Sequence, residues 1–108
     1  MGRRSKTGST TTSLTDKAAV AVLTGARLNL ARDLLKRNLV HVREIPNGRD
    51  FLFLGPELET HDALKAIVDA EKVTTRFLHI DYVQVDQYFL LRIVGSDSEQ
   101  YAISTYFA

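Results

Sequence analysis

A short polar turn between two apolar segments is the feature that most restricts how this chain folds. Asn47-Gly48 lies between Val40–Ile45 and Asp50–Leu54, and Asn-Gly between two β-prone segments is a strong signal for a hairpin turn. Pro46 lies just before this turn, where its missing backbone N–H does least harm. The sequence therefore predicts a β-hairpin over residues 40–54.

The second strand of this hairpin carries apolar residues on both of its faces. Successive strand side chains point to opposite faces, so Phe51 and Phe53 share one face while Leu52 and Leu54 share the other. A strand with two apolar faces is typical of a sheet that is covered on both sides. We therefore expect both faces of this strand to be covered.

The N-terminal part predicts a tail followed by a helix. Residues 1–12 are rich in Ser, Thr, Gly and basic residues, which is typical of a disordered segment. Ser13 and Asp16 fit a capping box, and helical periodicity continues to about Leu39. Because glycine costs roughly 1 kcal/mol relative to alanine in a helix, Gly25 is expected to kink the helix or divide it into 14–24 and 26–38. Residues 13–108 are expected to form a single domain.

The remaining segments predict a second helix and three more strands. Thr60 is the expected N-cap of the helix, which ends near Lys72. Residues 75–85, 88–94 and 100–107 are rich in β-branched and aromatic residues. The predicted order is α-ββ-α-βββ, an α+β fold with an N-terminal helical segment and one further helix packed on a mostly antiparallel sheet. The expected core comprises Val20, Leu23, Leu28, Leu35, Phe51, Phe53, Leu64, Ile67, Leu78, Ile80, Phe89, Leu91, Ile93 and Ile103.

Composition narrows the class of protein. The absence of cysteine excludes disulfides and thiolate chemistry. The longest apolar run, Ala18–Leu23, is far shorter than the roughly twenty residues that cross a bilayer. We therefore expect a soluble, cytoplasmic protein with no membrane partner.

The two halves of the chain carry opposite charge. Residues 1–50 hold ten Lys and Arg against four Asp and Glu, whereas residues 51–108 hold four against nine. A basic half can bind nucleic acid or an acidic partner, and halves of opposite sign also suit self-association. The candidate contact residues are Arg27, Arg32, Lys36, Arg37, Arg43 and Arg49.

The run LLKRNLVHVREIPNGRDFLFL, residues 34–54, resembles the passage from recognition helix to wing in winged-helix regulators. This resemblance implies that the basic helix residues lie near phosphates and that Arg43 or Arg49 lies on the wing. Winged-helix domains have three helices before the wing, whereas one long or two short helices precede it here. We therefore interpret residues 37–54 as a core hairpin with a basic tip.

His79 and Asp81 form the one catalytic-looking pair. Two residues apart on a predicted strand, they share a face, and a carboxylate beside an imidazole can raise its basicity. The opposite face carries Leu78, Ile80 and Tyr82, which favours a solvated position for the pair. The three histidines show no metal-binding spacing, so we expect neither a metal nor a cofactor.

The order of elements is similar to that of nuclear transport factor 2-like proteins, in which an N-terminal helix, a hairpin and a further helix precede long antiparallel strands. The resemblance implies a concave sheet that forms a pocket or dimerises, with His79 and Asp81 in the pocket. A small-ligand protein or enzyme of this type is thus one alternative, and a nucleic-acid-binding regulator is another. Because no catalytic motif is present, we favour a non-catalytic interaction module that binds a protein partner or a second copy of itself.

Overall fold

The structure is a computed structural model and describes residues 25–108. Residues 25–38 are helical. They are followed by β1 (Leu39–Ile45), β2 (Gly48–Leu54), α3 (Glu57–Thr74), β3 (His79–Val85), β4 (Tyr88–Val94), the 3₁₀ turn η1 (Asp97–Glu99) and α4 (Gln100–Ser104). The order α-ββ-α-ββ-α confirms the α+β class and the antiparallel sheet.

Several predictions concern residues 1–24 and lie outside the described part of the chain. They are the disordered tail over residues 1–12, the capping box at Ser13, the helical segment 14–24 and the core positions Val20 and Leu23. Gly25 itself is helical. In the described residues no helix is both long and apolar enough to cross a membrane.

The sheet joins two hairpins through their inner strands. Its order is β1-β2-β4-β3, and all three pairings are antiparallel. The predicted first hairpin is present, but its turn lies one residue earlier than expected. Ile45 pairs with Gly48, so Pro46 and Asn47 form the loop, and Asn47 has a φ of 62°. Proline followed by a residue with positive φ is the pattern of a type II turn, which explains the shift.

The second hairpin turns where the sequence predicts. Val85 pairs with Tyr88, which leaves Asp86 and Gln87 as a two-residue loop. Asp86 has a φ of 56°, a left-handed conformation that aspartate tolerates better than most residues. The four strands thus form two compact hairpins laid side by side.

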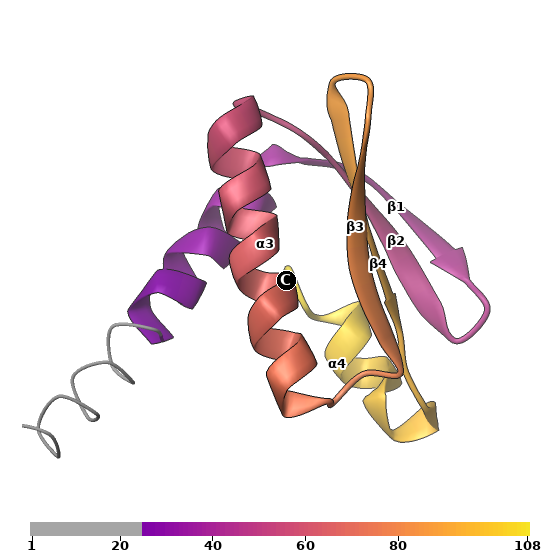
Figure 1. Cartoon of the computed structure of the whole chain (residues 1–108). Coiled ribbons are helices and arrows are strands. Elements are labelled where there is room, and N and C mark those ends of the chain that lie inside the picture. The colour runs from indigo at the N-terminus through magenta and orange to yellow at the C-terminus, as the bar shows by residue number, and fades with distance from the viewer. Residues whose placement is uncertain (1–24) are drawn as a thin grey trace, which may run out of the picture.

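One face of the sheet holds the core, and the described helices all pack on that face (Figure 1). Phe51 and Phe53 on β2, together with Phe89 on β4, lie there and are buried. The expected core positions Leu35, Phe51, Phe53, Leu64, Ile67, Ile80, Phe89, Leu91, Ile93 and Ile103 are all buried, and Leu28 is partly buried.

Three local predictions around α3 are wrong. The helix begins at Glu57 rather than after Thr60, and Thr60 is buried inside it. It ends at Thr74, where Thr75 takes a left-handed conformation with a φ of 52°. The following strand therefore begins at His79 and not at residue 75. Leu78 lies in the connection and is 74% exposed, so its assignment to the core is wrong.

The predicted strand over residues 100–107 is also wrong, because α4 occupies its first half. Gln100 begins α4, and its side-chain amide donates hydrogen bonds to the carbonyls of Asn47, Gly95 and Ser96. Those bonds hold the segment beside the first hairpin turn instead of in the sheet. The side chains that it buries, Ile103, Tyr106 and Phe107, follow a spacing of three and four residues, which is helical.

The end of the chain is locked to α3 through Glu71. The Tyr106 hydroxyl donates a hydrogen bond to a Glu71 carboxylate oxygen (2.7 Å), and the Arg76 guanidinium donates another (2.8 Å). Burial and the bond to Glu71 together raise the pKa of Tyr106 to about 12. Phe107 packs edge-to-face on Phe51, with ring centroids 5.0 Å apart. The last residues are therefore part of the core.

Replacement of Gly48 tests the tight contact between the first turn and β4. A Cβ at Gly48 would collide with the backbone carbonyl of Ile93, whereas a Cβ at Gly25 would meet nothing within 4 Å among the described residues. Gly48→Ala should lower the free energy of unfolding by about 1–3 kcal/mol or more, as overpacked sites do. The control Gly25→Ala should be neutral or stabilise by about 0.5–1 kcal/mol, since it removes a helical glycine. Equal urea midpoints for the two variants would contradict this packing.

Removal of the Tyr106 hydroxyl tests the Glu71 lock. Tyr106→Phe should lower the free energy of unfolding by about 1.5–3 kcal/mol, the usual range for a hydrogen bond to a charged group. The control is Tyr101→Phe, because Tyr101 is 79% exposed.

The effect of Tyr106 should disappear at alkaline pH. Because folding raises its pKa from 10.0 to about 12, its contribution is fully present below pH 10 and is lost as pH rises through about 12. Thermal melts should therefore show wild type and Tyr106→Phe converging above pH 10. A constant difference between the two across that range would contradict the lock.

Candidate functional site

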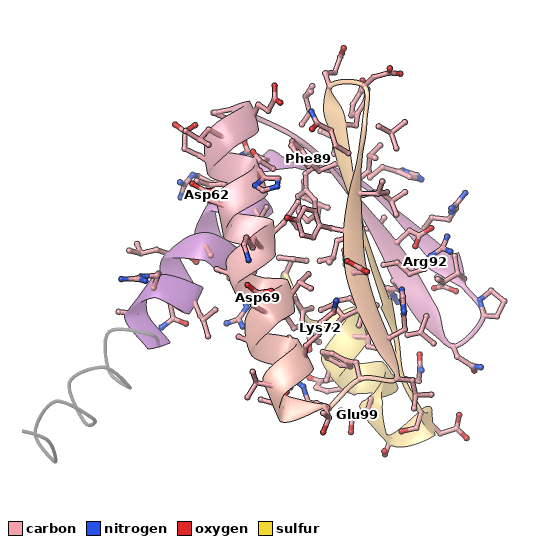
Figure 2. The ribbon with its side chains drawn as sticks, viewed as in Figure 1. Asp62, Asp69, Lys72, Phe89, Arg92 and Glu99 are labelled. Atoms are coloured by element: carbon pink, nitrogen blue, oxygen red, sulfur yellow. The ribbon has the colours of Figure 1, made fainter. Side chains whose placement is uncertain are left out.

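The sheet face opposite the helices is the candidate site, and we call it the outer face. Strand alternation and the pairing register assign its residues, which are His41, Arg43 and Ile45 on β1, Gly48, Asp50, Leu52 and Leu54 on β2, Tyr88, Leu90, Arg92 and Val94 on β4, and His79, Asp81, Val83 and Val85 on β3. In Figure 2 Phe89 lies on the helix side of the sheet and Arg92 on the other.

No element of the described residues 25–108 covers the outer face (Figure 1). Its apolar side chains are therefore in contact with solvent, and Val83 on β3 is 54% exposed. Leu54 and Val85 are also exposed, while Leu52 and Leu90 are partly buried. Within the described part of the chain, the helices cover one face of β2 and leave the other uncovered. The expectation that both faces are covered therefore holds for one face only.

A row of four charged residues crosses the outer face, one from each strand. The register places Arg43 opposite Asp50, Asp50 opposite Arg92, and Arg92 opposite Asp81. In the spatial order of the strands the row reads Arg43, Asp50, Arg92, Asp81, so the charges alternate. Rows that are largely apolar lie on both sides of it, with Leu52, Leu90 and Val83 in one of them.

Asp50 is the centre of this row and is 3% exposed, although it lies on the uncovered face. Its two neighbours cover it. Arg92 donates from Nε (2.7 Å) and Nη2 (2.9 Å), and Arg43 donates to the same carboxylate. The hydrogen bonds from Arg92 hold the pKa of Asp50 below its usual value of 3.8. Burial acts in the opposite direction, and the hydrogen bond from Arg43 lowers the pKa further. Asp50 is therefore an ionised carboxylate clamped between two cations.

His79 and Asp81 lie side by side on the outer face of β3, and both are exposed. Asp81 lies 3.8 Å from the ammonium of Lys72, and its carboxylate accepts a hydrogen bond from the backbone N–H of Tyr82. No hydrogen bond links His79 to Asp81 in the described residues. Together with Arg92 and Leu90 they line an open depression of about 420 Å³.

The basic residues suggested by the sequence do not form one patch. Arg43 lies on the outer face with Asp50, whereas Arg49 lies on the helix side and pairs with Glu44 at 3.5 Å. Arg32 lies on the 25–38 helix with its guanidinium 5.0 Å from the centre of the Tyr106 ring. Arg27, Lys36 and Arg37 are exposed on the same helix.

No metal site is evident among the residues that the structure describes, since no three potential ligands cluster there. His61 on α3 contacts the Tyr82 hydroxyl instead, with Nε2 3.1 Å from that oxygen. This pair bridges α3 and β3 on the helix side of the sheet.

Asp50 and Arg92 are the two members of the charged row that are not among the site residues predicted from the sequence. Both lie in the middle of strands whose other residues are largely apolar. A charged residue at the centre of an inner strand needs a partner, and this was the available signal. The partner itself could not be named without the strand order.

Comparison with known protein families, with curated proteins and with solved structures finds no match to this chain. The resemblances to winged-helix regulators and to nuclear transport factor 2-like proteins therefore stay predictions.

Neutralising Asp50 tests the central clamp. Asp50→Asn leaves Arg43 and Arg92 without their common anion and should lower the free energy of unfolding by about 1–3 kcal/mol at neutral pH. Because the folded pKa lies below 3.8, this contribution is complete above that pH and is lost as pH falls through the folded pKa. The difference in melting temperature between wild type and Asp50→Asn should therefore shrink in acid.

The matched control is Asp86→Asn, the same chemical change in an exposed turn whose backbone asparagine tolerates. It should change the melting temperature little at any pH. An Asp50→Asn variant as stable as this control at pH 7 would show that the clamp contributes nothing.

Proposed function

We propose that this chain is a non-catalytic interaction module and that it docks a protein partner through the outer face. The supporting observation is that the inner strands β2 and β4 carry apolar residues on both faces while the described helices pack on one. An exposed surface that combines apolar rows with charged residues at defined positions is characteristic of an interaction site.

The chemistry of the outer face suits a protein surface better than a small ligand. The depression beside His79 and Asp81 is open to solvent, whereas small-molecule sites enclose most of their ligand. The charged row provides polar groups at fixed positions between apolar rows, and such groups set orientation and specificity in protein interfaces.

The same row makes a poor site for nucleic acid. Phosphate binding needs cations in excess, whereas Arg43 and Arg92 each share the carboxylate of Asp50 and Asp81 lies at the end of the row. The row therefore presents two positive and two negative side chains. A protein with its own alternating charges complements this pattern.

Site-specific photo-crosslinking tests the proposal. A photoreactive amino acid at Val83, in the full chain expressed in its native cells, should give light-dependent adducts with a protein. The control is the same substitution at Val73 on α3, which is 84% exposed and remote from the outer face. Absence of adducts at position 83, or the same adducts at both positions, would contradict docking through this face.

A further inference from the structure

The charged row has a symmetry that indicates what covers it. Read from β1 to β3, its signs are plus, minus, plus, minus. Reversing such a row exchanges every positive position for a negative one. Two copies of the row therefore complement each other when one of them is reversed, and clash when it is not.

Two symmetric arrangements can stack a pair of these sheets face to face with aligned strands. A two-fold axis parallel to the strands, passing between β2 and β4, reverses the strand order of the second copy. Arg43 then faces Asp81 of the other copy, and Asp50 faces Arg92. An axis that crosses the strands leaves the order unchanged and would bring each charge against its like.

The apolar rows fit the first arrangement as well. An axis parallel to the strands maps each row onto itself, so Leu52 faces Leu90 of the second copy and Val83 faces His41. Leu54 and Tyr88 are matched in the same way. Apolar side chains from the two sheets would then interdigitate around the charged row, as they do in sandwich cores.

The flat area of the outer face comes close to that of the smallest specific interfaces. Strands about 4.8 Å apart with a rise of about 3.3 Å per residue give each outer face a flat area near 450 Å². Two copies would thus bury about 900 Å² of flat area, and the uneven surface formed by their side chains is not included in this figure. This approaches the threshold of about 1,000 Å² for specific interfaces.

We propose that a second copy of this chain covers the outer face, in a dimer whose two-fold axis runs parallel to the strands. This inference rests on the proposed function and names its partner. Arg43 and Asp81, whose side chains are 59% and 55% exposed, form the two symmetric contacts at the ends of the row. In this arrangement Asp50 and Arg92 form the centre of the interface.

The first experiment is equilibrium sedimentation of the wild-type chain. It should show a monomer–dimer equilibrium whose dissociation constant rises with ionic strength, because the row contributes charge pairs. A monomer at the highest soluble concentration would overturn the inference. It would leave the proposed function intact if crosslinking at Val83 captured a different protein.

Charge reversal at the ends of the row tests the predicted axis. In a dimer of Arg43→Glu, the new carboxylate of each copy faces the carboxylate of Asp81 in the other copy. In a dimer of Asp81→Arg, the new guanidinium group of each copy faces the guanidinium group of Arg43 in the other copy. Each variant should dimerise at least about tenfold more weakly than wild type, a difference of about 1.4 kcal/mol. A mixture of the two variants should recover the dimer, because every end contact then joins opposite charges.

The recovery in the mixture separates an interface from a folding defect, since two misfolded chains would not restore each other. Failure to recover a dimer from two folded variants would overturn the proposed axis. Circular dichroism and thermal melts establish that each variant is folded.

A milder pair of variants keeps the inference testable if a reversed charge prevents folding. His41→Cys and Val83→Cys each introduce one thiol into a chain that has no cysteine, and both positions are exposed. Stacked sheets lie about 10 Å apart, within reach of a short bis-maleimide. In a mixture of the two variants, the proposed dimer predicts crosslinks between position 41 of one copy and position 83 of the other. Crosslinks joining 41 to 41 or 83 to 83 would overturn it.

Discussion

The pairing of β2 with β4 is the constraint on which the rest of the structure depends. A lone two-stranded hairpin is at best marginally stable in water, and each hairpin here becomes part of a four-stranded sheet through that one ladder. The register aligns Phe51 with Leu91 and Phe53 with Phe89, which concentrates the large apolar side chains on one face. The helices then have a single surface on which to pack.

Local patterns in the sequence were sufficient for most of the fold. The two hairpins, the helix after Gly55-Pro56 and ten core positions follow from alternation, helical spacing and turn chemistry. The last segment was missed because Ile103 is apolar in either periodicity, and β-rich composition favoured a strand. Its helical form depends on hydrogen bonds from Gln100 to the distant carbonyl of Asn47, which a local pattern does not contain.

The candidate site was less predictable because it depends on strand order. Strand alternation places His79 and Asp81 on a common face, and the structure has them there. The charged row needs Arg43 and Asp50 from one hairpin and Arg92 and Asp81 from the other. Asp50 and Arg92 are 42 residues apart, and sequence spacing alone gives no reason to join them. Within its own strand, each of the two is only a charged residue among largely apolar ones.

The way in which the two hairpins meet also constrains the order of folding. Each hairpin closes a two-residue loop, which is a fast and local event. The β2–β4 ladder instead has to close a loop that contains all of α3, and its entropy cost precedes any gain from the joined sheet. Until that step Phe51 and Phe53 have neither β4 nor Phe107 to cover them. The barrier to folding is therefore expected at the docking of the two hairpins, with the chain most prone to aggregate just before it.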